Sequence, residues 1–197
     1  TQDNTKQYLQ KMLGSRTNQF ITTLATMVGS NSALNECDRA SLMGSALKAA
    51  SMNLPIDQNL GFAYVIPYKN KGVAQASFQI GYKGLIQLAQ RSGQVISINA
   101  VEVKEGEFKG RDMLGEPVIE WLPEDERTDK KTIGYMAGLR LVNGFTKIIY
   151  WTIADIEKHA NKYSQAYRNA KKYGQSDTIW IEGFDSMAKK TLLKALI

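Results

Sequence analysis

Cysteine is almost missing from this chain: Cys37 is the single one in 197 residues. One cysteine excludes an intrachain disulfide framework, and it favours a reducing compartment, for which the cytoplasm is the simplest choice. The chain also has one histidine, His159, so it cannot build a zinc finger, a zinc ribbon or a two-histidine metal site. We therefore expect no metal ligands and no bound cofactor.

Long apolar runs are missing as well. No uninterrupted run approaches the roughly 20 residues that a bilayer-spanning helix requires, and residues 1–10 are too polar for a signal peptide. The chain starts without methionine and ends inside a helical pattern, LLKALI. We expect both natural termini to lie outside the sequence in hand.

Motifs for nucleotide hydrolysis are also lacking. No GxxxxGK[ST] segment occurs, and the dipeptide Gly-Lys is never found, which excludes a phosphate-binding loop of that kind and disfavours an ATP-driven motor. Glu102-Val103-Lys104 has the spacing of a magnesium nuclease motif, but the nearest upstream acid is Asp57, before the first hairpin. A nuclease is kept only as a third alternative, and no catalytic residue is expected.

The composition is that of a folded, basic protein. Apolar residues make up 43% of the chain, enough for a sizeable core, and 25 basic against 19 acidic residues give a net charge of +6 and a pI near 9.3. Such a charge favours polyanionic partners. Many basic proteins bind nothing acidic, so the position of the charges matters more than their sum.

The N-terminal part is predicted to be helical, and a hairpin and a helix follow it. Apolar residues recur at helical spacing over 5–28 and 36–52. GFAYVIPY and VAQASFQI flank the turn KNKG, which indicates a β-hairpin with a basic tip at Lys69 and Lys71. Residues 82–93 then form an amphipathic helix that ends at a glycine.

The C-terminal half alternates strands and helices. Residues 94–104 are rich in β-formers, and 132–151 give two strands around Asn143-Gly144, a strong hairpin turn signal. Thr152 and Asp155 have the spacing of a capping box, and a last helix runs from Ile179 onward. The acidic segment 106–131 is predicted to be a long, mobile loop.

This order of elements predicts an α+β fold with antiparallel β-hairpins, a crossing helix and C-terminal helices. We expect a single core over 1–197, with a helical part at 1–56 and the α+β part at 57–197. The helical part, which has few charges for its length, is a candidate subunit interface or an ordinary piece of core.

Charge is distributed in blocks. No acid occurs between Asp57 and Glu102 or from Lys158 to Ser176, whereas Glu102–Asp129 holds ten acids against four basic residues. Cations in the acid-free tracts alternate with tyrosines, a combination that suits single-stranded nucleic acid: lysine and arginine neutralise phosphates while bases stack on aromatic rings. The alternative is that the tyrosines belong to the core and the lysines to a solvated face.

Within helix 82–93, one face is polar and basic. Lys83, Gln87, Gln90 and Arg91 follow i, i+4, i+7 and i+8, opposite the apolar side chains of Leu85 and Ile86. An ordinary surface helix would look similar. The lack of acids nearby favours a binding face.

Two segments resemble the RecT family of phage and prophage recombination proteins: SFQIGYKGLIQLAQRSG at 77–93 and FDSMAKKTLLKALI at 184–197. GFAYVIPYKNKG and the tract 151–180 occur in the family's order, so the resemblance spans most of the chain. It implies an ATP-independent protein of the bacterial cytoplasm that binds single-stranded DNA, anneals complementary strands in homologous recombination, and assembles into rings or helical filaments on the duplex.

The resemblance also implies a phage exonuclease as partner, contacted through a region beyond Ile197, and no membrane. A single-strand coat without annealing activity is the alternative function. Charge and position in the matching segments give the candidates for DNA contact: Lys69, Lys71, Tyr82, Lys83, Gln87, Arg91, Lys104, Arg111, Lys147, Lys171, Lys172, Tyr173, Lys189, Lys190 and Lys194.

Overall fold

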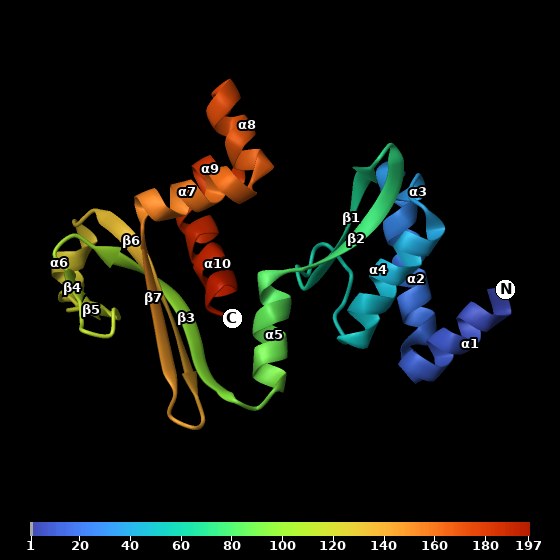
Figure 1. The fold of residues 1–197 in the computed structure, drawn as a ribbon, viewed down its shortest axis with the longest axis horizontal. Helices are drawn as coiled ribbons and strands as arrows, with labels where there is room; N and C mark the ends of the chain where they lie inside the picture. Colours follow the sequence, from blue (N-terminus) through green and yellow to red (C-terminus); the bar gives the residue numbers. More distant parts are fainter. Residues whose placement is uncertain (1) are drawn as a thin grey trace. The chain divides into compact units, whose positions relative to one another are not determined.

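The computed structural model describes residues 2–197, and the side chains from Gln7 onward. The chain divides into two compact units, the first ending at Leu88 and the second running from Ala89 to Ile197. The two units are described separately below, and Figure 1 labels their elements.

Helices form most of the first half of unit 1. Asn31 and Asp38 begin two of them, because their side-chain oxygens accept hydrogen bonds from backbone N–H groups that the first helical turn leaves unpaired. The elements are α1 (Gln2–Leu13), the 3-10 turn η1 (Gly14–Arg16), α2 (Thr17–Gly29), α3 (Ser32–Asn35) and α4 (Arg39–Ser51).

The predicted hairpin is present as β1 (Ala63–Asn70) and β2 (Val73–Ile80), which pair antiparallel. Its two turn residues, Lys71 and Gly72, both have positive φ, +48° and +86°. Two such residues between paired strands make a type I′ turn, whose twist matches that of the strands. The KNKG tip is thus fixed in shape and exposes its lysines.

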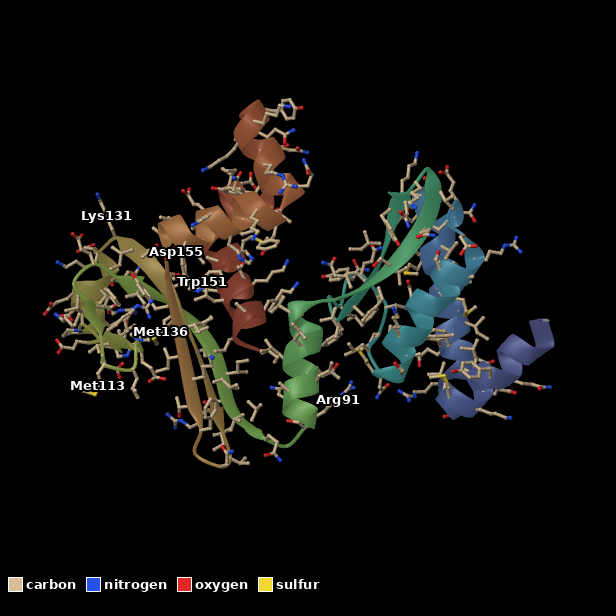
Figure 2. All side chains as sticks on the ribbon, in the orientation of Figure 1. Arg91, Met113, Lys131, Met136, Trp151 and Asp155 are labelled. Atoms are coloured by element: carbon tan, nitrogen blue, oxygen red, sulfur yellow. The ribbon has the colours of Figure 1, made fainter. Side chains whose placement is uncertain are left out.

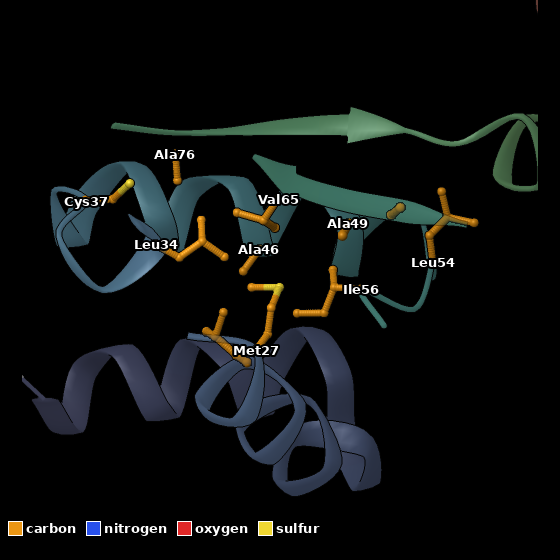
Figure 3. Close-up of a cluster of buried hydrophobic side chains, with 11 residues drawn as sticks. Met27, Leu34, Cys37, Ala46, Ala49, Leu54, Ile56, Val65 and Ala76 are labelled. Atoms are coloured by element: carbon orange, nitrogen blue, oxygen red, sulfur yellow. The ribbon is translucent and has the colours of Figure 1, made fainter. Parts of the chain in front are cut away.

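One face of the hairpin packs on the helices. Met27, Leu34, Ala46, Ile56 and Val65 are among the buried side chains of the core that α2, α3 and α4 share with β1 and β2 (Figure 3). The hydroxyl of Ser45 on α4 donates a hydrogen bond to the Ala76 carbonyl on β2 at 3.0 Å, which fixes the helix against the sheet. The hairpin therefore belongs to unit 1.

Helix α5 (Tyr82–Arg91) follows the hairpin. At Gly84 a Cβ atom would lie 2.1 Å from the Phe62 carbonyl oxygen, so only glycine allows the helix to approach this closely. The predicted amphipathic helix is confirmed, and Gly93 ends the following turn with φ +68°.

Unit 2 is built on a three-stranded antiparallel sheet in the order β3-β6-β7. The strands are β3 (Val95–Lys104), β6 (Thr132–Leu141) and β7 (Thr146–Thr152). Gly144, at φ +87°, donates its N–H to the Leu141 carbonyl, and the Leu141 N–H pairs with Phe145. Asn143 has no positive φ, so this turn is a longer type I turn with a bulge rather than a two-residue one.

Helices α7 (Ile153–Tyr163) and α10 (Phe184–Leu196) cover one face of this sheet (Figure 1), and α8 (Gln165–Tyr173) and α9 (Ile179–Glu182) pack against these helices. The capping box at Thr152 and Asp155 is confirmed. Tyr135, Ile156, Trp180 and Leu192 are buried between the sheet and the helices. The predicted last helix is interrupted at Gly183, which separates α9 from α10.

The acidic segment at 106–131, expected to be a long loop or a mobile excursion, contains regular structure, so the expected long loop is wrong. It contains the strands β4 (Phe108–Arg111) and β5 (Pro117–Ile119) and the short helix α6 (Glu124–Thr128). Glu107 is 0% exposed and accepts hydrogen bonds from Arg127 Nε at 2.5 Å and from the backbone N–H groups of Lys104 and Leu122. This buried pair fixes both ends of the segment.

The α+β class is confirmed, with antiparallel pairing in each sheet. Each of the two units has its own buried cluster, and the boundary between the units lies between Leu88 and Ala89. Alternation along a strand shows that one face is buried, but not which helices bury it. Within residues 2–197, no helix has the length and apolar character needed to cross a membrane.

Candidate nucleic-acid interface

The hairpin of unit 1 has an open face. Tyr64, Ile66 and Tyr68 lie on the side of β1 opposite the buried Val65, and the polar Gln75 and Gln79 face them from β2. A hollow of about 420 Å³ lies on this side of the strands, next to Ile66 and Tyr68. Exposed aromatic rings beside amides and hydroxyls can accept stacked bases.

Cations border this face. Lys69 and Lys71 are exposed at the turn. The side chain of Lys83 lies beside Gly61, whose added Cβ would be 3.6 Å from Lys83 Cδ and 3.2 Å from the Tyr64 hydroxyl. The aliphatic part of Lys83 and the Tyr64 hydroxyl therefore both lie near Gly61.

The α5 face is only partly as predicted. Lys83 and Arg91 are exposed, whereas Tyr82 and Gln87 are half-buried. The Gln87 Oε1 atom is buried and has no hydrogen-bond partner among the described residues. The basic ends of the face are open to solvent and its centre is packed.

In unit 2 a cavity of about 510 Å³ lies between β7 and α7. Three rings form a ladder along it: Trp151 and His159 have centroids 5.1 Å apart, and His159 and Tyr163 have centroids 4.6 Å apart. Tyr163 is 65% exposed at the end of this ladder. Figure 2 shows Trp151 and Asp155 where β7 passes into α7.

Three cations line the same cavity: Arg111, Lys158 and Lys162. Asp155 is the acid among the lining residues, and its carboxylate is held by the hydroxyl and N–H of Thr152 in the capping box. Burial, with help from Lys162 and Lys194, lowers the pKa of His159, so this ring is mainly neutral at pH 7. The cavity can hold an anionic group beside a flat ring.

The candidates drawn from the sequence include Arg111 but miss most of this cavity. Asp155, Lys158, His159, Lys162 and Tyr163 follow i, i+3, i+4, i+7 and i+8 on α7, so they share one helical face. That spacing could have identified the site. Arg111 itself donates hydrogen bonds to the carbonyls of Gly115 at 2.7 Å and Tyr150 at 3.5 Å.

The two tyrosines of α8 differ in exposure. Tyr167 is buried, whereas Tyr173 is 64% exposed and lies under the ammonium of Lys172, 5.0 Å from its ring centroid. Lys171 is shared between Glu157, at 3.7 Å, and the ring of Tyr167. Lys172 and Tyr173 are therefore the more open pair.

Lys104 and Lys189 are held inside unit 2. Both donate to Glu102, Lys104 to Oε2 at 2.9 Å and Lys189 to Oε1 at 2.8 Å. Hydrogen bonds from Lys189 and Lys104 outweigh burial and lower the pKa of Glu102 to about 2. Both oxygens of the Glu102 carboxylate therefore already have a lysine as partner. In the described part of the chain, no three His, Cys, Asp or Glu residues are placed to hold a metal ion.

The remaining candidates differ in exposure. Lys147 and Lys194 are exposed, and Lys190 is half-buried, with burial and the nearby Lys194 lowering its pKa. Contact with DNA stays a prediction for each of the fifteen candidate residues. The structure separates those that are open from those that are engaged within the fold.

Both units expose cations and aromatic rings, and ten of the acids lie between Glu102 and Asp129. These are features of a protein that contacts the phosphates and the bases of a nucleic acid. Comparison with known proteins agrees. The model described as the RecT family matches residues 18–197. The chain belongs to the RecT family, which confirms the resemblance seen at 77–93 and 184–197.

Two curated relatives are similar over most of this chain. "Uncharacterized protein YqaK" of Bacillus subtilis (strain 168) is 40% identical over 188 residues, which are 95% of this chain and 61% of the relative. "Protein RecT" of Escherichia coli (strain K12) is 32% identical over 183 residues, 90% of this chain and 64% of the relative. The chain thus spans less than two thirds of the length of either relative.

Proposed function

We propose that this protein binds single-stranded DNA and anneals complementary strands without ATP, in homologous recombination. The observation that carries the proposal is that exposed cations occur with exposed rings: Lys69 and Lys71 follow the exposed Tyr68 at the hairpin turn, and the Lys162 ammonium lies 5.0 Å from the centroid of the Tyr163 ring. Membership of the RecT family supports the same function.

Annealing makes and breaks no covalent bond. It requires that the repulsion between two phosphate backbones be reduced and that bases remain available for pairing. Lysines at the hairpin turn and on α5 and α7 can contact phosphates, and such contacts do not depend on the DNA sequence. A base can stack on the face of an exposed ring such as that of Tyr163 and can leave the ring when a complementary strand arrives.

A monomer of net charge +6 holds DNA weakly, so adjacent copies on one strand are part of the proposal. Each bound copy raises the effective concentration of DNA for the next. We propose that the protein acts as an oligomer on DNA in the bacterial cytoplasm, together with an exonuclease that produces the single strands.

The test mixes two complementary oligonucleotides, one with a fluorophore and one with a quencher, with the full chain in buffer free of ATP and magnesium. Rapid quenching relative to DNA alone supports annealing. Slower quenching with protected strands indicates a coat protein, and cleavage after magnesium is added indicates a nuclease; either result overturns the proposal.

A matched pair of variants connects the activity to the proposed surface. Lys71→Ala removes a cation from the hairpin turn, and Lys109→Ala removes one that lies 3.4 Å from Glu120 in the acidic segment. Both lower the net charge equally. The first should slow annealing and the second should leave it near the unaltered rate.

A further inference from the structure

Two large apolar side chains stand in solvent at the β4–β5 turn of unit 2. Met113 is 98% exposed and Leu114 is 84% exposed, the highest values among the large apolar residues of the described chain. Figure 2 labels Met113 at the end of this turn. Adjacent apolar side chains exposed to this extent mark a surface that a partner covers.

The turn that holds them is rigid. The Asp112 carboxylate accepts hydrogen bonds from the N–H groups of Leu114 at 2.9 Å and Glu116 at 2.8 Å. Asp112 also donates its N–H to the Glu116 carbonyl, and Arg111 binds the Gly115 carbonyl at 2.7 Å. Because the backbone is fixed before binding, little conformational entropy is lost when the two side chains enter a pocket.

The charge around the turn restricts the partner. Asp112 and Glu116 flank the two apolar residues in the turn, within the stretch Glu102–Asp129 that contains ten acids and four basic residues. Such a surface repels DNA and the anionic lipids of a membrane. It suits a protein pocket that is apolar inside and basic at its rim.

Unit 1 has a pocket of this kind. Its volume is about 210 Å³, room for a Met or Leu side chain. The apolar part of its lining comes from the end of α1, from α2, from the end of α4 and from the segment after α4: Leu13, Phe20, Ala50, Leu54, Pro55 and Ile56. The polar side chains of Gln19, Thr23 and Asn53 complete the lining. Arg16 lies at the pocket and Lys11 is exposed one turn earlier. The helical part of the chain thus offers an apolar pocket with a basic rim.

We propose that the β4–β5 turn of one copy docks on the Leu13–Phe20–Ile56 pocket of another copy of this chain, with Met113 entering the pocket and Leu114 packing beside it. Acidic residues around the turn then face Arg16 and Lys11. Since the turn and the pocket are different surfaces, the contact is head-to-tail and can repeat from copy to copy. The inference deepens the proposed function, because it supplies the contact by which copies assemble on DNA.

Crosslinking between copies tests the contact. A full chain with Met113→Cys and a tagged full chain with Gln19→Cys, at the pocket, are mixed with and without single-stranded DNA and treated with a short bismaleimide. Cys37 is buried and its pKa is raised by burial, so it reacts little. The control pairs Met113→Cys with Gln79→Cys, which is exposed on β2.

We expect the Met113–Gln19 pair to give at least fivefold more linked dimer than the Met113–Gln79 pair. Equal yields, with or without DNA, overturn the contact. Met113→Ser/Leu114→Ser alters only exposed side chains, so it should leave the thermal midpoint unchanged while reducing the assembly size on DNA in sedimentation. Unchanged assembly size also overturns the proposal.

The two proposals fail separately. If the specific crosslink forms and the chain does not anneal DNA, the contact stands and the proposed function is wrong. If the chain anneals DNA and the crosslink is no better than its control, the function stands and the contact is wrong.

Discussion

Lys189 on α10 donates a hydrogen bond to Glu102 on β3 at 2.8 Å, across 87 positions of sequence. The same carboxylate accepts from Lys104, and Lys104 also donates to Thr132 on β6 at 2.9 Å. One half-buried acid therefore joins the last helix of unit 2 to two strands of its sheet. These two lysines stabilise the fold, and any contact with DNA would have to compete with Glu102.

The Glu102 pair should make stability depend on acid pH. Its pKa falls from an ordinary 4.5 to about 2 in the folded chain, so its contribution is present above pH 4.5 and is lost as pH falls towards 2. At about 1.4 kcal/mol per pH unit, the loss is about 3 kcal/mol. Urea unfolding of the unaltered chain and of Glu102→Gln, from pH 7 to 2.5, should show the difference between them shrinking in that window.

Glu120→Gln is the control for that series, because the Glu120 carboxylate is exposed and pairs with the exposed Lys109 at 3.4 Å. It should lose little stability at pH 7 and should follow the unaltered chain at every pH. A Glu102→Gln curve parallel to that of the unaltered chain over the whole range would show that the ion pair contributes nothing.

Local patterns predicted the local structure well. The KNKG turn, the α5 helix and the Thr152–Asp155 capping box each depend on residues a few positions apart, and each is present. The interrupted helix at Gly183 and the folded segment 106–131 were missed. The latter depends on Glu107 and Arg127, whose pairing across 20 positions leaves no periodic signal.

The candidate site remains a prediction, and the structure shows only which of its residues are exposed. Acid-free tracts identified the hairpin turn, α5 and α7–α8, but sequence could not tell an exposed cation from an engaged one. Lys104 and Lys189 are held by Glu102, whereas Lys69 and Lys71 are open. Tyr167 and Tyr173, six positions apart, are buried and exposed respectively. Such differences arise from tertiary packing, which composition does not report.

Gly84→Ala should destabilise unit 1. The new Cβ would lie 2.1 Å from the Phe62 carbonyl oxygen, and a backbone atom cannot move away as a flexible side chain can. Overpacking of this kind costs about 1–3 kcal/mol. Gly44→Ala in α4 is the control, because nothing lies within 4 Å of its Cβ and alanine favours helix by about 1 kcal/mol. Thermal unfolding should rank Gly44→Ala highest and Gly84→Ala lowest.

Lys83→Ala/Arg91→Ala should weaken binding to every single-stranded sequence alike. If both cations contact phosphates, the slope of log affinity against log salt should fall by about 1.4, at about 0.7 per contact. Lys109→Ala/Lys130→Ala removes the same charge from the acidic segment and should change the slope little. Fluorescence anisotropy over a salt series measures both. An unchanged slope in Lys83→Ala/Arg91→Ala would mean that this face of α5 is solvated and not a DNA contact.

Tyr163 is expected to stack a base at the open end of the α7 cavity. Tyr163→Ala should weaken binding of single-stranded DNA by about 1–3 kcal/mol, the usual value of one base on one ring, because the ring is 65% exposed and so has a face open to a base. Tyr163→Phe keeps the ring and should bind almost as the unaltered chain does, which separates stacking from hydrogen bonding by the hydroxyl. Titrations at one fixed salt concentration measure the affinities, and circular dichroism checks that the fold is kept. Equal affinity of the alanine and phenylalanine variants would remove Tyr163 from the interface and leave Lys158 and Lys162 as charges without a stacking partner.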